Sequence, residues 1–141
     1  MNARQRLPGT SVAIVAVLLV FFATAPRVLS ETDNPSISAA TFQAARKDEV
    51  VLDVRTGTEY RSGHLENAIN ININDRNFEQ RIAALDPAKT YVVHCGANVP
   101  NGRADRALTK LRAAGFSNLV SLEGGYSSWV ESGGTVWTSK D

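Results

Sequence analysis

The sequence predicts a single α/β domain with a largely parallel sheet, and two observations support this fold class. Short runs of β-branched and other apolar residues, typical of buried strands, alternate with segments whose apolar residues recur at helical spacing. The alternation continues from about residue 36 to the C-terminus, a length that suits one domain with one core.

The expected elements follow in order from the residue pattern. Val50–Val54 is a nearly continuous apolar run, whereas Ala68–Ile73 alternates apolar and polar residues and suits a half-buried strand. Pro87 and Gly115 each mark the end of a helix. The expected strands are 50–54, 68–73, 91–93 and 119–122. The expected helices are 38–47, one turn at 56–61, and then 78–85, 103–114 and 126–131.

The N-terminal segment has the pattern of a secretory signal peptide. Arg4 and Arg6 precede an apolar run from Val12 to Phe22, and small residues follow it. A retained membrane anchor is the alternative, but a spanning helix needs about 20 apolar residues and this run is shorter. We therefore expect cleavage after Ser30 and a periplasmic or secreted protein. The expected division is a signal peptide over 1–30, a flexible lead-in over 31–35 and one domain over 36–141.

Charge gives little indication of a partner. The whole chain carries +1, but cleavage before Glu31 removes Arg4, Arg6 and Arg27 from the 15 Lys and Arg residues, leaving 12 against 14 acidic residues, or −2. No basic block remains that would bind nucleic acid or an anionic membrane surface. The pattern contains no indication of oligomeric state.

Cys95 is the one cysteine of the sequence, which excludes an internal disulfide and a dithiol mechanism of the thioredoxin type. It lies at the carboxyl end of the expected strand 91–93, the edge where α/β sheets bind ligands. A buried, inert thiol is the alternative, because cysteine is often buried for packing alone. Its position before a turn-rich loop and a helix favours a functional thiol.

The seven residues after Cys95, from Gly96 to Gly102, are rich in glycine and asparagine. Such residues can turn several backbone N–H groups toward one point, and the N-terminus of the next helix adds positive charge, so both features favour a thiolate. Arg103 can hold an oxyanion through two hydrogen bonds, although an exposed surface arginine is an equally good interpretation. The candidate catalytic residue is Cys95, and the candidate substrate-binding residues are Gly96, Ala97, Asn98, Gly102 and Arg103.

The two histidines are expected to be structural. His94 alternates with Cys95 along the strand and should point away from the thiol, and His64 should hydrogen-bond to backbone. Two separate histidines and one cysteine do not make a metal site, and no cofactor is expected. Tyr126 and Trp129 have the spacing of a buried helix face.

Three groups of residues occur in order along the chain. The first is Asp53-Val54-Arg55, Glu59-Tyr60, Gly63-His64-Leu65 and Ala68-Ile69-Asn70. The second is Cys95 with the helix that begins at Arg103, and the third is Leu122-Glu123-Gly124-Gly125 with Trp129 and Gly133. Together, over about residues 36–136, they resemble the single-domain rhodanese-like family.

The resemblance implies a sheet of about five mostly parallel strands flanked by helices, and a sulfurtransferase activity. Cys95 would take sulfane sulfur from thiosulfate or a persulfide and pass it to a thiophilic acceptor such as cyanide or a thiol. The loop N–H groups would hold the anionic donor and the persulfide, while Asp53, Arg55 and Glu123 would order the loops.

The Gly96–Gly102 loop departs from the family pattern because it is longer, and Pro100 removes one N–H donor from it. A longer loop could hold a larger anion or fold over the thiol, so the use of thiosulfate stays open. Arg106 is the substitute if Arg103 does not line the site. Two alternatives also remain: a phosphatase or arsenate-reductase-like enzyme on the same fold, and a non-catalytic module that binds an anion or a protein.

Overall fold

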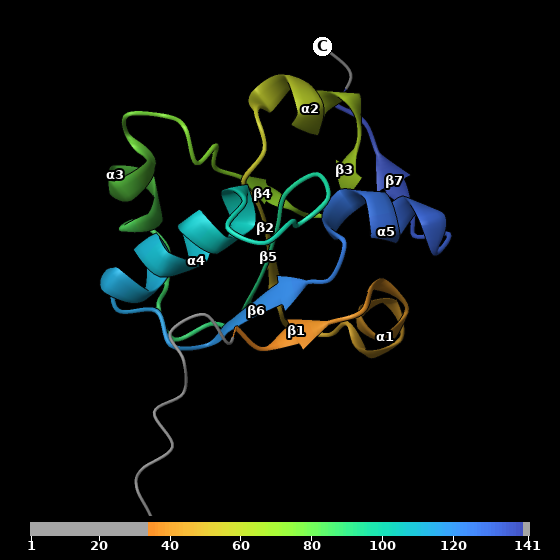
Figure 1. The fold of residues 1–141 in the computed structure, drawn as a ribbon, viewed down its shortest axis with the longest axis horizontal. Coiled ribbons are helices and arrows are strands. Elements are labelled where there is room, and N and C mark those ends of the chain that lie inside the picture. The colour runs from red at the N-terminus through yellow and green to blue at the C-terminus, as the bar shows by residue number, and fades with distance from the viewer. Residues whose placement is uncertain (1–33, 140–141) are drawn as a thin grey trace, which may run out of the picture.

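The computed structural model describes residues 34–139, so the predicted signal peptide lies outside the described residues (Figure 1). Its main sheet has five parallel strands in the order β1-β6-β5-β2-β4. These strands are β1 (Ser36–Ile37), β2 (Val50–Asp53), β4 (Ile69–Asn70), β5 (Tyr91–His94) and β6 (Leu119–Leu122). A second, antiparallel pair consists of β3 (His64–Leu65) and β7 (Val136–Trp137). The predicted α/β class and the five-stranded parallel sheet are confirmed.

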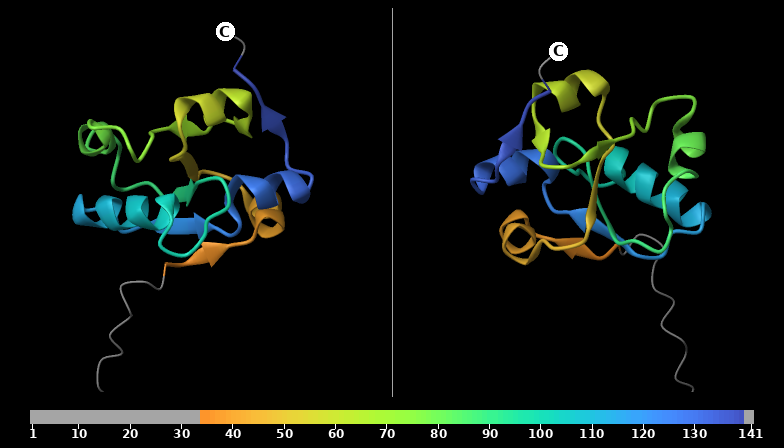
Figure 2. Two further views of the ribbon diagram at one scale, coloured as in Figure 1. Left: turned by 45° about the horizontal axis from the view of Figure 1, so that its top comes forward. Right: turned by 180° about the vertical axis from the view of Figure 1, so that it is seen from behind.

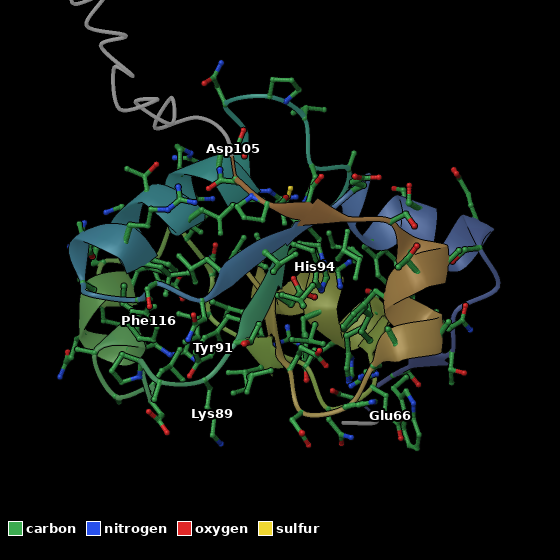
Figure 3. The ribbon with its side chains drawn as sticks, turned by 90° about the horizontal axis from the view of Figure 1, so that it is seen from below. Glu66, Lys89, Tyr91, His94, Asp105 and Phe116 are labelled. Carbon is green, nitrogen blue, oxygen red and sulfur yellow. The ribbon has the colours of Figure 1, made fainter. Side chains whose placement is uncertain are left out.

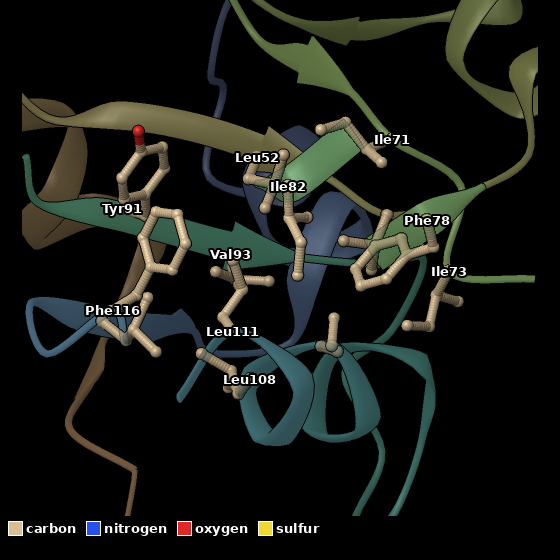
Figure 4. Packing of buried hydrophobic residues seen from close by; sticks show 14 of the residues in the cluster. Leu52, Ile71, Ile73, Phe78, Ile82, Tyr91, Val93, Leu108, Leu111 and Phe116 are labelled. Carbon is tan, nitrogen blue, oxygen red and sulfur yellow. The ribbon is translucent and has the colours of Figure 1, made fainter. Parts of the chain in front are cut away.

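Helices cover both faces of the main sheet (Figures 1 and 2). They are α1 (Ala39–Ala45), α2 (Gly57–Ser62), α3 (Phe78–Ile82), α4 (Arg103–Ala113) and α5 (Gly125–Glu131). Leu52 and Val93 belong to the hydrophobic cluster shared with α3 and α4, which Figure 4 shows, while their strand neighbours Val51 and Val92 belong to the cluster shared with α1 and α5. Because neighbouring residues of a strand point to opposite faces, an unbroken apolar strand fits a sheet covered on both sides.

Several of the predicted elements are shorter in the structure. The strand predicted over 68–73 is regular only at β4, which is an edge strand paired with β2 alone. Ile71 and Ile73 nevertheless donate backbone hydrogen bonds to Asp53 and Val54, and both side chains are buried. The helix predicted over 78–85 ends at Ile82. No helix within residues 34–139 is long and apolar enough to cross a membrane.

Candidate active site

Cys95 follows β5, the central strand, at the carboxyl edge of the sheet, as predicted. Its side chain is buried, with 4% of the residue exposed. The Cys95 carbonyl oxygen accepts a hydrogen bond from the N–H of Tyr126 at 2.9 Å and lies 3.1 Å from Nδ1 of His94. The peptide that carries the thiol is therefore fixed from both β5 and α5.

Asn98 ties the beginning of the loop to β6. Its Oδ1 accepts the N–H of Cys95 at 2.7 Å, and its Nδ2 donates to the Leu122 carbonyl at 2.6 Å and to the Ser121 hydroxyl at 3.1 Å. The residue has a φ of +43°, a left-handed conformation that asparagine tolerates. The side-chain amide is thus committed to the protein, so the predicted binding role of Asn98 would fall to its backbone N–H.

The additional length of the loop forms an outward turn. Gly102 N–H donates to the Val99 carbonyl at 2.9 Å, and Asn101, with a φ of +57°, donates its N–H to Oδ2 of Asp105 at 2.7 Å. Val99, Pro100 and Asn101 are exposed, and Figure 3 shows the segment between β5 and α4 standing out from the body of the domain. A left-handed residue at the third position is characteristic of a type II β-turn.

Several backbone donors around Cys95 are left free for an anion. Within residues 34–139, no protein acceptor is hydrogen-bonded to the N–H groups of Gly96, Ala97, Asn98 or Val99. The first N–H groups of α4 also have no intrahelical acceptor, and the helix dipole favours negative charge at that end. We call Gly96–Val99 the N–H loop. The N–H of Gly102, also predicted to bind, is instead used by the turn.

The pair Gly124-Gly125 allows this loop to approach α5 closely. A Cβ on Gly125 would lie 2.6 Å from the Cys95 carbonyl oxygen and 2.8 Å from Oδ1 of Asn98, and its φ is +60°. Only glycine combines that backbone conformation with so little space. The Gly124-Gly125 pair is therefore part of the site.

Arg103 lies beside the loop and is paired with Glu59. Its Nη1 and Nη2 donate to the two carboxylate oxygens at 2.7 and 2.8 Å, and a Cβ on Gly96 would lie 3.4 Å from Nη2. The hydrogen bond from Arg103 lowers the pKa of Glu59 to about 2. Arg106 points elsewhere, with Nη2 3.3 Å from Oδ1 of Asn74. We call Glu59 and Arg103 the rim pair.

Sequence reasoning did not find the pairing of Glu59 with Arg103. The available signal was the pattern Thr56-x-x-Glu59, a capping box in which each side chain bonds to the backbone N–H of the other residue. The capping box fixes Glu59 in the first turn of α2, from which its carboxylate reaches α4.

The ion pair of Asp53 and Arg55 and the neighbouring His94 form a second, buried polar group, which we call the buried cluster. Arg55 Nη2 lies 2.6 Å from Oδ2 of Asp53 and donates to the Gly63 carbonyl at 2.7 Å. Its guanidinium also stacks on the half-buried Tyr126 ring, with Cζ 4.1 Å from the centroid. Arg55 thus joins β2 to the segment after α2 and to α5, which agrees with the ordering role that the resemblance implies.

His94 is completely buried, and its ring lies beside Asp53. Nε2 lies 3.8 Å from Oδ2 of Asp53 and has no hydrogen-bond partner within residues 34–139. Burial lowers the pKa of His94, although the negative charge of Asp53 opposes this effect. His64, as predicted, is close to backbone, with Nδ1 2.9 Å from the Tyr60 carbonyl oxygen.

The remaining predicted residues occupy structural positions. Trp129 is buried in the core, as predicted, whereas Glu123 is exposed and accepts a hydrogen bond from the Ser36 hydroxyl at 2.7 Å. Within residues 34–139, no group of three or more His, Cys, Asp or Glu side chains is arranged to hold a metal ion.

Comparison with known proteins agrees with this geometry. Residues 38–132 match the Rhodanese-like domain family. The chain is 36% identical over 92 residues to thiosulfate sulfurtransferase 18 of Arabidopsis thaliana, covering 57% of this chain and 65% of that protein. It is 27% identical over 103 residues to thiosulfate sulfurtransferase GlpE of Shewanella oneidensis, covering 73% of this chain and 97% of that protein.

A solved structure shares both fold and sequence. The rhodanese-related protein of Thermoplasma volcanium superimposes with a TM-score of 0.66 at 34% identity, covering 74% of this chain and 99% of that structure. With the family match over residues 38–132, this similarity shows that the chain belongs to the rhodanese-like domain family.

Proposed function

We propose that this protein is an exported sulfurtransferase that carries sulfane sulfur as a persulfide on Cys95. The observation that supports this most directly is the placement of the thiol before the N–H loop and the N-terminus of α4. The four N–H groups of that loop have no acceptor within residues 34–139. The thiosulfate sulfurtransferase names of two relatives support the same reaction class.

The reaction has two steps. First, the Cys95 thiolate attacks the outer sulfur of the donor; the sulfur–sulfur bond of the donor breaks, and the leaving group, sulfite or a thiolate, keeps the electron pair. Second, an acceptor nucleophile attacks the outer sulfur of the persulfide, and Cys95 leaves as the thiolate. Because the sequence has no second cysteine, the acceptor must be another molecule, such as cyanide or a thiol.

Backbone groups of the protein assist the reaction by binding the negative charge of the donor and of the persulfide. The free N–H groups of the N–H loop can bind the outer sulfur of the persulfide or the donor anion, and preorganised donors of this kind stabilise charge as it develops. Asn98, Tyr126 and Gly125 keep the Cys95 peptide in one position, so these donors need not reorganise.

The test is the mass of the protein before and after donor treatment. The full chain is expressed in a host that exports proteins, purified, and incubated with thiosulfate or with 2-hydroxyethyl hydropersulfide, beside the Cys95→Ser variant. We expect one added sulfur atom on the wild type alone and its release by cyanide as thiocyanate. A starting mass that begins at Glu31 would support export with cleavage after Ser30. A thiol that alkylates readily but never gains sulfur would contradict the proposal.

The phosphatase or arsenate-reductase alternative is less well supported. Such an enzyme needs a general acid near the leaving group, and the nearest carboxyl of α4, on Asp105, already accepts the Asn101 N–H at 2.7 Å. Hydrolysis of an aryl phosphate that disappears in Cys95→Ser would favour this alternative. If the protein neither takes up sulfur nor hydrolyses the phosphate, the alternative of a non-catalytic binding module would be favoured.

A further inference from the structure

The cation beside the N–H loop is already occupied by an anion of the protein itself. Arg103 uses both of its Nη atoms for the two carboxylate oxygens of Glu59, at 2.7 and 2.8 Å. This fork-to-carboxylate arrangement is the one through which arginine otherwise binds an oxyanion. The guanidinium cannot hold Glu59 in this way and present the same fork to a donor.

No other cation replaces it on the loop. The segment from Gly96 to Gly102 contains neither lysine nor arginine. Arg106 is exposed and directed toward Asn74, while Asp105 adds an acidic group to the first turn of α4. An incoming donor therefore meets backbone N–H dipoles and a neutral ion pair whose carboxylate stays charged at neutral pH.

We propose that Glu59 determines the donor specificity of the site: it disfavours dianionic donors such as thiosulfate, and it tolerates donors with at most one negative charge, such as alkyl hydropersulfides. The inference rests on the proposed function. Glu59 cancels the attraction of Arg103 for an anionic donor. Because Coulomb energy is proportional to charge, this cancellation weighs twice as much for a dianion as for a monoanion. With the hydropersulfide, the Cys95 thiolate takes the outer sulfur of R–S–SH and R–S⁻ leaves; with thiosulfate, sulfite leaves.

The experiment compares how fast each donor loads Cys95 in two charge variants. Second-order rate constants for sulfur addition are measured by rapid quench and intact mass, with thiosulfate and with 2-hydroxyethyl hydropersulfide. Glu59→Gln removes the charge but keeps the capping box, because glutamine also serves at that position. We expect about a ten-fold faster reaction with thiosulfate and at most about a three-fold faster reaction with the hydropersulfide, since the logarithm of the effect follows donor charge.

Arg103→Gln provides the opposite change, because it leaves the Glu59 carboxylate without its partner. The thiosulfate rate constant should fall more than the hydropersulfide rate constant. If Arg103 instead bound the donor with Glu59 holding it in place, both variants would slow thiosulfate loading, and that result would overturn the inference. An unchanged ratio of the two rate constants in Glu59→Gln would overturn it too.

Glu79→Gln is the matched control. Glu79 also forms an ion pair with α4, through Lys110 near the other end of the helix. Glu79→Gln changes the net charge of the protein by the same amount as Glu59→Gln. Both rate constants should stay within about two-fold of the wild type, because salt screens exposed charges at a distance. Melting temperatures confirm that each variant is folded. Failure of the proposed function would look different, since neither donor would then add sulfur to Cys95.

Discussion

Two arginine–carboxylate pairs lie near Cys95, and they differ mainly in their access to water. In the buried cluster, the side chains of Arg55 and Asp53 are 4% and 0% exposed. In the rim pair, those of Arg103 and Glu59 are 27% and 39% exposed. The N–O distances are similar, at 2.6 and 2.7 Å, so the contrast lies in the surroundings of each pair and not in its geometry.

The difference separates stability from specificity. A buried charge that loses its partner is costly, so the Asp53–Arg55 pair must remain intact for the fold. An exposed pair is screened by water and salt and adds little stability, but its charges still act on a ligand held nearby. We therefore expect mutations of the buried cluster to act on folding, and mutations of the rim pair to act on donor choice.

The largest predicted effect follows the removal of the buried carboxylate. In Asp53→Ala, Arg55 keeps its charge without a partner, and only 3% of this residue is exposed to water. The substitution should therefore lower the free energy of unfolding by about 3–5 kcal/mol. Urea denaturation measures the loss. Asp75→Ala is the control, because Asp75 forms an exposed pair with Arg81 at 3.9 Å and should cost less than about 1 kcal/mol. Equal losses in the two variants would remove the distinction between buried and exposed pairs.

The sequence predicted the parts of this arrangement that depend on local pattern. The apolar run at Val50–Val54 predicted a strand between two helical layers, and the turn-rich segment after Cys95 predicted a loop at the carboxyl edge of the sheet. β1, β3 and β7 were not predicted, since two residues have no periodicity and these strands form only by pairing with distant partners.

The contacts across the site could not be predicted for a related reason. Glu59 and Arg103 are 44 residues apart, and their pairing depends on how α2 lies over the start of α4. Asn98 was predicted to bind substrate because asparagine readily adopts the left-handed conformation that can turn backbone N–H groups toward an anion. Its side chain turns inward because Leu122 and Ser121 offer it acceptors from β6, a position fixed only by the folded sheet.

The next effect is the dependence of stability on pH, which should differ between the buried cluster and the rim pair. Burial lowers the pKa of His94 below its usual 6.5, so below that pH the unfolded chain binds a proton that the folded chain does not. The stability associated with neutral His94 is thus complete above pH 6.5 and is lost as the pH falls through the folded value, by at most about 1.4 kcal/mol per pH unit. Urea unfolding between pH 7.5 and 5.5 measures the slope.

The control for this slope is substitution of the histidine itself. His94→Asn keeps a polar group near the Cys95 carbonyl but has no titrating ring, so its unfolding free energy should depend less on pH in that range. Glu59→Gln should keep the wild-type slope, because Glu59 titrates far lower, at about 2. A slope that is unchanged in His94→Asn would show that His94 does not link pH to folding.

The smallest predicted effect is the stability contributed by the rim pair. A double-mutant cycle with Glu59→Gln and Arg103→Gln should give a coupling energy of about 0.5 kcal/mol at neutral pH, and less in 1 M salt, because both side chains are partly exposed. The pKa of Glu59 is lowered to about 2 by the Arg103 hydrogen bond. The coupling is therefore complete above the usual value of 4.5 and is lost as the pH falls toward 2.

The size of this coupling decides how the donor experiment is interpreted. If the coupling energy is about 0.5 kcal/mol, the rim pair contributes too little stability for its loss to loosen the fold. A ten-fold change in the thiosulfate rate constant would then come from the charge of Glu59. A coupling above about 2 kcal/mol, independent of salt, would instead place the rim pair with the buried cluster as scaffold. In that case a change in donor preference in Glu59→Gln would reflect movement of α2 against α4, because the capping box and the Arg103 bonds share the same carboxylate.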